Sequence, residues 1–292
     1  MRGREIKMPP DAVSTDDLDF RVKVLEHALR YERSRLDHAL AVGEGIIETI
    51  ETFHAARTSA DYMRAFTDTA PLVSVCICTM NRAELLTERC LRSLREQTYR
   101  NLQIVVVGDH CTDDTESRIA GLRDDRIAFV NLPRRGPYPP PGRDRWCVAG
   151  TNAVNEALVR CEGAFVMHLD DDDRAVPERV ETLLRAAQEH RADLCWHPFW
   201  SEQPDGTWTL LGNGAFELGQ ITTGSFFYHR ALTRIPWDVH AYRLGEPGDW
   251  NRLRKIRVLR PQLHFVDTPL LYHYREQNQS PFEAQDGETF LP

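Results

Sequence analysis

Short apolar runs alternate with helical patterns along the chain from Pro71 onward. The runs cover residues 72–78, 102–107, 127–132, 164–169 and 193–196. Apolar runs of this length are typical of buried parallel strands, and the segments between them are long enough for the helices that connect such strands. The alternation therefore predicts an α/β domain with a Rossmann-like, mostly parallel sheet flanked by helices.

Three of the connecting segments carry an apolar face with helical spacing. The residues on these faces are Leu86, Cys90, Leu91 and Leu94; Val154, Ala157, Leu158 and Cys161; and Val180, Leu183, Leu184 and Ala187. Asn81 and Glu84 have the spacing of a capping box, so we expect Asn81 to cap the first of these helices. Asp113 stands where a further helix should begin.

Before residue 70 the pattern differs, because helical stripes replace the strand runs. One stripe follows a capping Ser14 and the other precedes the main domain: Leu18, Val22, Leu25, Leu29 and Leu36, then Ile46, Ile50 and Phe53. We predict an N-terminal helical extension over residues 1–70 and a main domain over residues 71–292. The first stripe fits either packing on the main domain or a homodimeric coiled coil, which usually needs about three to four uninterrupted heptads.

Composition and charge narrow the classes of protein that these elements can form. The chain has 292 residues, of which 41% are hydrophobic and 27% charged, as expected for a soluble globular protein with a sizeable core. Its net charge of −8 argues against binding to nucleic acid or to anionic lipid. No apolar run approaches the roughly 20 residues of a membrane span, and residues 1–10 lack the apolar core of a signal peptide. Seven cysteines without a CxxC pair favour a cytoplasmic compartment and no zinc site.

Polar clusters follow three of the predicted strands where each strand ends. They are Thr79-Met-Asn-Arg82, residues 108–113, and the run Asp170-Asp-Asp-Asp173. Ligands of parallel α/β sheets bind beyond the carboxyl ends of the strands, so we expect these clusters to share one site. Four adjacent carboxylates repel one another, and a bound Mg²⁺ or Mn²⁺ relieves that repulsion. A solvated acidic turn is the alternative interpretation of the run alone.

These segments resemble the motifs of family-2 glycosyltransferases, which have the GT-A fold. In that family a first strand ends in a Pro-Thr-Tyr-Asn-Arg-like turn, a second ends in Val-Asp-Asp-Gly-Ser before Thr-Asp-x-Thr, and a Leu-Asp-x-Asp-Asp segment precedes a proline. Here the matching segments are Cys78-Thr-Met-Asn-Arg82, Val107-Gly-Asp-His-Cys-Thr-Asp-Asp-Thr115, and Leu169-Asp-Asp-Asp-Asp173 with Pro177. The resemblance is close over residues 71–200 and looser over residues 201–292, which predicts a nucleotide-sugar half and an acceptor half.

The chain departs from the family pattern at three places. Met80 stands where tyrosine is usual, Gly108 replaces the first aspartate of the pair, and His110-Cys111 replaces Gly-Ser. Asp109 is therefore left as the single carboxylate at the end of the second strand.

The resemblance implies a set of nucleotide-sugar-binding residues. They are Thr79, Asn81, Arg82, Asp109, Asp170 and Asp171, with Arg143 and Arg145 as candidates for the diphosphate. Because a carboxylate only accepts hydrogen bonds, Asp109 suits the N3–H of uracil or thymine, which favours a UDP-sugar and then a dTDP-sugar. The alternative role of Asp109 is to cap the helix that follows it.

A divalent cation, Mn²⁺ or Mg²⁺, is implied by the same resemblance. Asp172 is expected to contact the metal directly, and Asp170 to reach the metal or the ribose, with Asp171 and Asp173 as secondary candidates. Related enzymes sometimes complete the metal site with a late histidine, which points to His273, although a single histidine is more often structural.

The catalytic base is expected in the last third of the chain. Asp249, in the segment Gly245-Glu-Pro-Gly-Asp-Trp250, matches the aspartate of a Glu-Asp-Trp-like family segment. It would take the proton of the acceptor hydroxyl during direct displacement, which implies an inverting enzyme. Glu246 is the reserve base, and a helix N-cap is the alternative role of Asp249. Residues 200–225 are predicted to form a mobile or hairpin region over the site.

Two other functions compete with a glycosyltransferase of the hexosyltransferase type. A metal-dependent nucleotidyltransferase also places carboxylates beside a nucleotide site. Such an enzyme usually has a glycine-rich, basic phosphate loop near the first strand, and this sequence has neither feature there. A non-catalytic nucleotide-sugar-binding protein would use the N-terminal helices as its interaction surface. The acceptor class stays open between lipid, polysaccharide, protein and small molecule.

Overall fold

The computed structural model describes residues 21–25, 29 and 46–275, and the chain divides into two units, residues 1–44 and 45–292. In the first unit residues 21–25 and 29 are helical, with Val22, Leu25 and Leu29 exposed. The rest of the first predicted stripe and its capping Ser14 lie outside the described residues, and so does most of the predicted dimer surface.

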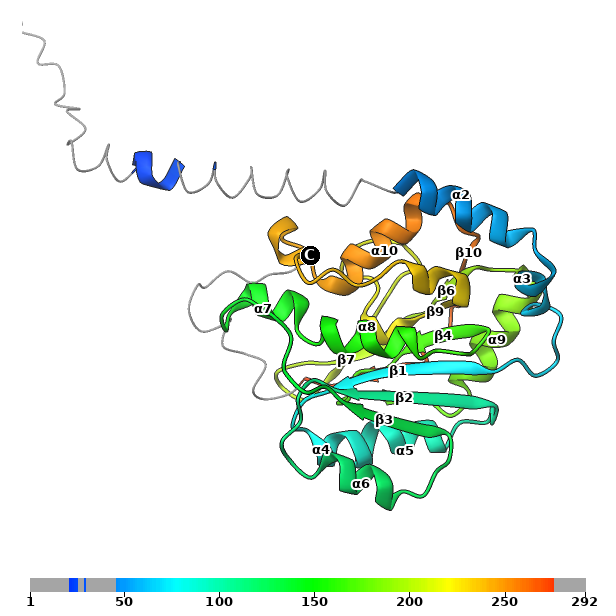
Figure 1. Ribbon diagram of the computed structural model, residues 1–292, viewed down its shortest axis with the longest axis horizontal. Coiled ribbons are helices and arrows are strands. Elements are labelled where there is room, and N and C mark those ends of the chain that lie inside the picture. Colours follow the sequence, from blue (N-terminus) through cyan, green and yellow to red (C-terminus); the bar gives the residue numbers. More distant parts are fainter. Residues whose placement is uncertain (1–20, 26–28, 30–45, 276–292) are drawn as a thin grey trace, which may run out of the picture. The chain divides into compact units, whose positions relative to one another are not determined.

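A seven-stranded sheet forms the centre of the second unit (Figure 1). In spatial order its strands are β10 (Leu263–Phe265), β6 (Leu194–Trp196), β9 (Phe226–His229), β4 (Phe165–His168), β1 (Val73–Thr79), β2 (Leu102–Gly108) and β3 (Ile127–Asn131). Only the pairs that β9 makes, with β4 and β6, are antiparallel. The predicted α/β fold with a mostly parallel sheet is confirmed.

The strand register brings the ends of β1, β2 and β4 to one edge. Thr79 pairs with Gly108 at the ends of β1 and β2, and Cys76 pairs with His168 at the end of β4. The backbone continues this alignment past the strands, because the N–H of Asp109 donates to the carbonyl of Thr79 at 2.8 Å. The first, second and fourth predicted strands therefore deliver their polar ends to the same place.

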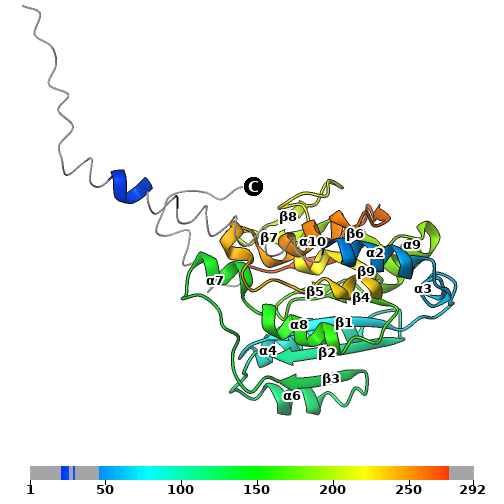
Figure 2. The ribbon, with the colours of Figure 1, turned by 45° about the horizontal axis from the view of Figure 1, so that its top comes forward.

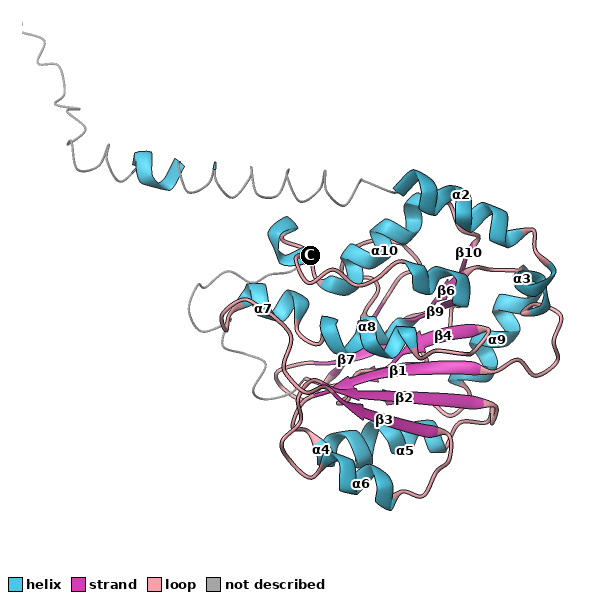
Figure 3. Ribbon diagram, in the orientation of Figure 1, coloured by secondary structure: helices cyan, strands magenta, loops and turns pink. Residues whose placement is uncertain are grey.

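Helices cover both faces of the sheet (Figure 3). Strands β2 and β4 lie on opposite sides of β1. Because connections between parallel strands are as a rule right-handed, the helices before these two strands belong on opposite faces. Those before β2 and β3 are α4 (Ala83–Leu85), the π-helical turn η1 (Leu86–Leu91), α5 (Arg92–Arg95) and α6 (Thr115–Gly121). On the other face α8 (Thr151–Val159) contacts β1 and β2. Further along are α9 (Arg179–His190) and α10 (Gly248–Val258).

The expected capping role of Asn81 is wrong. The N–H of Ala83, at the start of α4, donates to Asp113 at 3.2 Å, and Asp113 also accepts the N–H of Thr115 at the start of α6. Asn81 instead accepts the N–H of Thr112 at 2.7 Å. The sequence spacing misleads because the capping carboxylate comes from the end of a neighbouring strand, about 30 residues away along the chain.

A second, four-stranded sheet lies beyond the β9 side of the main sheet (Figure 2). Its order is β5 (Arg174–Ala175), β11 (Leu271–His273), β7 (Phe199–Glu202) and β8 (Trp208–Leu211). The hairpin of β7 and β8 falls at the start of the segment 200–225. Pairing of β11 with β5 carries the late part of the chain back to the acidic run, because Tyr272 lies opposite Arg174.

Two helices ahead of the first strand pack into the core of the sheet. They are α2 (Ile46–Arg57) and α3 (Ala60–Arg64), which bury Phe53 and Tyr62. The hydroxyl of Tyr62 donates to Asp193, and the ring of Phe66 meets that of Phe165 in β4 edge-on at 5.6 Å. In the described part of the chain, no helix is long and apolar enough to cross a bilayer.

The remaining elements are short helices around the polar edge. They are α7 (Arg143–Val148), η2 (Thr223–Ser225), η3 (Arg230–Arg234) and η4 (Ala241–Leu244). A small apolar cluster joins α7 to η4 through Cys147, Val148 and Ala241, which are all buried.

Candidate active site

The ends of β1 and β2 form one wall of the candidate site. Asn81 holds the two strand ends together through its bond to Thr112, and Asn81 and His110 both have positive φ angles, of 54° and 65°. A Cβ at Gly108 would lie 2.7 Å from the side-chain oxygen of Asn131, so a larger residue there would require Asn131 to move. Packing is therefore tight at the position where the family pattern has an aspartate.

Asp109 lies under the loop that follows β3. Its side chain accepts the N–H of Gly136 at 3.2 Å, and the guanidinium of Arg135 lies 3.9 Å away. Burial, together with the Asp109 carboxylate, raises the pKa of Tyr138. Asp113 rather than Asp109 bonds to the start of α6, so the helix-capping alternative for Asp109 is wrong.

The four aspartates form the loop between β4 and β5, and two of them face Arg82. Its guanidinium lies 3.2 Å from Asp171 and 2.7 Å from Asp172, and both carboxylates are almost fully buried. Arg89 of η1 donates to the backbone carbonyl of Asp172 at 2.7 Å. Asp172 is thus held between two arginines.

The other two aspartates face His273. The N–H of Asp173 donates to the carbonyl of Asp170 at 3.1 Å, and this tight turn sets the first and fourth carboxylates on the same side. Asp173 accepts the N–H of Tyr274 and lies 3.0 Å from Nδ1 of His273. Ligand atoms of Asp170, Asp173 and His273 all lie within 4.8 Å of one another. The sequence analysis ranked Asp173 second because only the strand pairing of β11 reveals this grouping.

Crowded carboxylates shift the pKa values across this loop. Burial, then the charges of Asp173 and Asp172, raise the pKa of Asp170 well above its usual range. Burial and the charge of Asp171 raise the pKa of Asp172 to about 7. Burial alone would lower the pKa of His273, but Asp173 and Asp170 outweigh it and raise the pKa to about 9. Because burial and mutual repulsion destabilise the ionised carboxylates, a cation bound beside them would be favourable.

The predicted base, Asp249, lies in the first turn of α10. Pro247 takes the N-cap position, while Asp249 accepts the N–H of Trp250 at 2.7 Å and a hydrogen bond from Thr223 at 3.3 Å. Burial raises the pKa of Asp249, and the nearby charge of His273 opposes that rise. Gly224, next to Thr223, packs against Leu271 of β11, the strand that carries His273, so the carboxyl group lies near the histidine of the acidic cluster.

The reserve base and the two loop arginines have other contacts. Glu246 lies 2.9 Å from the guanidinium of Arg254 and accepts a hydrogen bond from Asn251 at 2.7 Å. Nε of Arg145 donates to the carbonyl of Pro139 at 2.7 Å, which fixes the proline-rich loop. Arg143 begins α7 with an exposed side chain.

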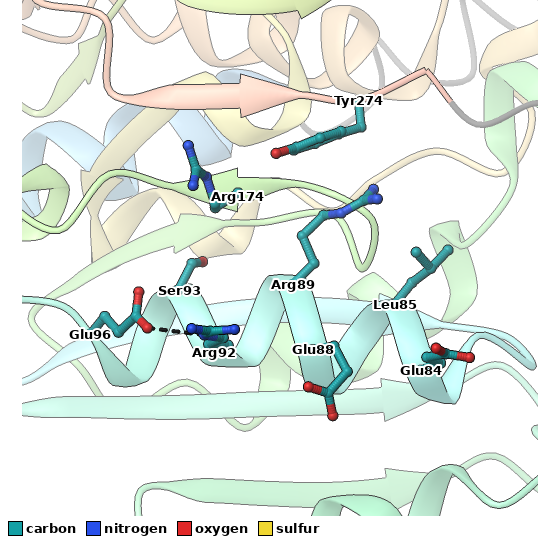
Figure 4. A pocket seen from close by; sticks show the side chains of 9 residues that line it. All are labelled: Glu84, Leu85, Glu88, Arg89, Arg92, Ser93, Glu96, Arg174 and Tyr274. Atoms are coloured by element: carbon teal, nitrogen blue, oxygen red, sulfur yellow. Dashed lines mark hydrogen bonds and ion pairs between the residues drawn. The ribbon is translucent and has the colours of Figure 1, made fainter.

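A pocket of about 490 Å³ adjoins the acidic loop (Figure 4). It is lined by Glu84, Leu85, Glu88, Arg89, Arg92, Ser93, Glu96, Arg174 and Tyr274. The guanidinium of Arg89 lies over the ring of Tyr274, 3.9 Å from its centre. The carboxylates of the acidic run do not line this pocket, so it is a neighbour of the candidate site and not the site itself.

Comparison with known proteins assigns the chain to a family. Residues 74–139 and 146–244, more than half of the chain, match the pattern described as glycosyl transferase family 2. The chain belongs to glycosyltransferase family 2. The resemblance seen in the three motifs is thereby confirmed for this family-2 protein.

Relatives of this family-2 protein share part of their length with it. GalNAc(5)-diNAcBac-PP-undecaprenol beta-1,3-glucosyltransferase of Campylobacter jejuni is 33% identical over 158 residues, which cover 53% of this chain and 47% of the relative. Chondroitin synthase of Pasteurella multocida is 27% identical over 239 residues, which cover 72% of this chain and 23% of the synthase. The chain spans half or less of the length of these curated relatives.

Solved structures share the fold. S. aureus TarS 1–349 in complex with UDP-GlcNAc has a TM-score of 0.56 and 20% identity, over 71% of this chain and 59% of that one. The mannosyltransferase PcManGT from Pyrobaculum calidifontis, in complex with GDP-Man and Mn²⁺, has a TM-score of 0.52 and 18% identity, over 80% and 70% of the two chains. The expected GT-A fold is confirmed.

Proposed function

We propose that this family-2 protein is a metal-dependent, inverting glycosyltransferase that takes a sugar from a nucleotide diphosphate sugar. A UDP-sugar is favoured and a dTDP-sugar comes next. One observation carries the proposal: the cluster of Asp170, Asp173 and His273 lies near the half-buried carboxyl group of Asp249. Thr223 bonds to Asp249, and the residue after Thr223 in the chain packs against the strand that carries His273. A cation site beside a candidate base suits sugar transfer from a diphosphate.

The ligand atoms of this cluster suit a divalent cation. Two carboxylates and an imidazole within 4.8 Å supply both the oxygen and the nitrogen ligands that Mn²⁺ accepts, whereas Mg²⁺ prefers oxygen alone. Asp170, Asp173 and His273 would hold the ion, with Asp172 beside them, although the carboxylate of Asp172 is now paired with Arg82. When bound, the ion supplies positive charge that stabilises the departing diphosphate.

Asp249 would act as the general base. It would take the proton of the acceptor hydroxyl as that oxygen bonds to the anomeric carbon, while the bond from that carbon to the diphosphate breaks. A raised pKa suits this task, because it makes the carboxylate a stronger proton acceptor. Thr223 positions the carboxyl group through its hydrogen bond. A single displacement inverts the configuration of the sugar.

The nucleotide would lie along the ends of β1 and β2. Asp109 would accept the N3–H of uracil, and Thr79, Asn81 and Arg82 would line the path from the base to the acidic loop. The name of one relative, UDP-Glc:alpha-D-GlcNAc-diphosphoundecaprenol beta-1,3-glucosyltransferase WfaP, and the UDP complex of TarS support a uridine nucleotide. In this scheme residues 71–200 form the donor half, and residues 201–292 supply Asp249 and His273.

Donor turnover tests this function directly. Full-length protein with Mn²⁺ would be incubated with UDP-glucose, UDP-GlcNAc, dTDP-glucose or GDP-mannose, and the nucleoside diphosphate and the anomer of the freed sugar would be measured. We expect UDP release that EDTA stops, with the freed sugar first appearing as the inverted anomer. Pyrophosphate release from a nucleoside triphosphate would instead indicate a nucleotidyltransferase, and binding without any turnover would indicate a non-catalytic binding protein.

A further inference from the structure

The match to the family pattern breaks beside the candidate base. It covers residues 74–139 and 146–244, so residues 140–145 lie outside the matched stretches. They complete the proline-rich loop and begin α7. Surface loops often carry specificity, because a loop can vary while the fold beneath it stays the same.

Helix α7 is held in place by packing. Cys147 and Val148 of α7 are buried against Ala241 of η4, and the rings of Tyr138 and Tyr242 pack against this cluster. At the other end of the loop the bond from Arg145 to the carbonyl of Pro139 fixes the turn. The remaining face of α7 is thus presented on a supported helix.

That face carries an exposed tryptophan. Trp146 is 55% exposed, whereas the other five tryptophans, all of which the structure describes, are buried or half-buried. Arg143 stands three residues before Trp146, so the two side chains are neighbours on the helix surface. An indole ring beside a guanidinium offers an apolar platform and an anion-binding group together.

The helix lies next to the predicted base. A Cβ on Gly248, the residue before Asp249, would lie 3.1 Å from the backbone carbonyl of Cys147, so the two helices touch at this point. The charge of Asp249 also acts on the Cys147 thiol. In Figure 1, α7 lies at the edge of the sheet where β1, β2 and β3 end. Whatever binds α7 is therefore close to the proton acceptor.

The loop is basic in an acidic protein. Residues 134–145 contain four arginines and one aspartate, while the whole chain has a net charge of −8. Positive charge concentrated at one edge of a negatively charged molecule attracts anions to that edge.

We propose that Trp146 and Arg143 form the acceptor subsite for an anionic saccharide. The indole of Trp146 would stack on the apolar face of a sugar ring, and Arg143 would bind a phosphate or carboxylate of the same saccharide. The assignment rests on the proposed function, because it places the acceptor hydroxyl beside Asp249. It also moves Arg143 from the donor diphosphate, where the sequence analysis put it, to the acceptor.

Direct binding tests the subsite without turnover. The probes are N-acetylglucosamine 1-phosphate, a hyaluronan tetrasaccharide and neutral chitobiose, titrated by calorimetry against full-length protein with Mn²⁺ and UDP. We expect W146A to weaken binding of all three probes by about tenfold or more and W146F to restore most of it. R143Q should weaken only the anionic probes, and the preferred probe shows whether the anion is a phosphate or a uronate.

Two controls separate this role from a structural one. V159A removes an apolar side chain that is 80% exposed at the far end of α8, and it should leave all binding unchanged. UDP affinity with Mn²⁺ should stay at the wild-type value in W146A, W146F and R143Q. A loss of UDP affinity in R143Q would return this arginine to the donor diphosphate and overturn its assignment.

The remaining outcomes distinguish this proposal from the proposed function. If the wild-type protein hydrolyses a nucleotide sugar but binds no probe, or binds each probe as well as W146A does, the subsite is wrong and the function stands. If W146A loses saccharide binding while the wild-type protein hydrolyses no donor, the subsite stands and the function is wrong. A change in oligomeric state in W146A, with saccharide binding intact, would make this surface a contact between copies of the chain.

Discussion

The acidic loop has two sides built from the same residue type, and they differ in what faces them. Asp171 and Asp172 face the guanidinium of Arg82, which carries a permanent positive charge. Asp170 and Asp173 face His273, whose charge depends on the carboxylates around it. The guanidinium of Arg82 does not deprotonate and so cannot bind a metal, whereas a neutral imidazole can. In the proposed function this difference places the metal on the His273 side, while Arg82 stabilises the two carboxylates of the other side.

The largest expected effect comes from replacing the proposed base, Asp249, which lies nearer the His273 side. In D249N the side chain keeps its size but cannot take a proton, so kcat should fall by about 10²–10⁴-fold. UDP affinity with Mn²⁺ should change little, because the proposed partner of Asp249 is the acceptor and not the nucleotide. E246Q is the matched control, since Glu246 is paired with Arg254. Full activity in D249N, measured by UDP release, would remove the base assignment.

Removing one carboxylate from each side tests the comparison itself. D173N should weaken Mn²⁺ binding by more than about a hundredfold, above the range that outer partners of a metal site cost. D172N should weaken Mn²⁺ binding less, because the carboxylate of Asp172 is already neutralised by Arg82. Electron paramagnetic resonance of free Mn²⁺ measures both affinities. A larger loss in D172N than in D173N would reverse the two sides and restore the expectation drawn from the family pattern.

Removing Arg82 should expose the charge that it balances. R82Q leaves Asp171 and Asp172 without their guanidinium, and because Arg82 is partly exposed we expect a loss of about 2 to 3 kcal/mol in the free energy of unfolding. Mn²⁺ should recover part of that loss, since a nearby cation replaces some of the missing charge. Urea unfolding with and without Mn²⁺ measures both values. An equal loss in the two conditions would mean that the two sides are electrostatically independent.

A histidine in the core, His229, has a pKa shift opposite in direction to that of His273. His229 accepts the N–H of Ala231 through Nδ1 and stacks on the ring of Phe66, and burial lowers its pKa to about 4. Its folded pKa is below its unfolded value of about 6.5, so the unfolded state binds more protons and stability falls as the pH drops below about 6.5. Between pH 7 and pH 5, His229 should lower the free energy of unfolding by about 2 kcal/mol.

The variant H229Q isolates that contribution. The difference in unfolding free energy between pH 7 and pH 5 should shrink by about 2 kcal/mol relative to the wild-type protein. Other buried histidines, such as His197, stay in place and serve as the common background. An unchanged pH dependence would show that His229 has the same pKa in the folded and the unfolded protein.

Local patterns predicted the first four strands and β6, because each is a short apolar run. They did not predict β9, which pairs antiparallel with β4 and β6 across more than 30 residues. Such a pairing depends on the rest of the fold and leaves no periodic signal of its own. The same reason explains the missed cap by Asp113, which reaches α4 from another strand end.

The candidate site, like the fold, could be predicted only where local sequence patterns determine it. The rim of Thr79, Asp109 and the acidic run could be predicted, because the carboxyl ends of parallel strands meet at one edge. The pairing of Arg82 with Asp171 and Asp172, and of His273 with Asp173, could not. These contacts join residues about 90 and 100 positions apart, and one tight turn decides which two of four identical side chains point together.

The most direct test of the account is a calorimetric titration of the full-length protein with UDP, dTDP, GDP and CMP, each with and without Mn²⁺. The account predicts that UDP binds tightly only when Mn²⁺ is present, because the diphosphate would bind through the ion held by the His273 side while Asp109 reads the base. Equal binding with and without Mn²⁺ would contradict the metal site. Failure of every nucleotide to bind would make the acidic loop a structural turn.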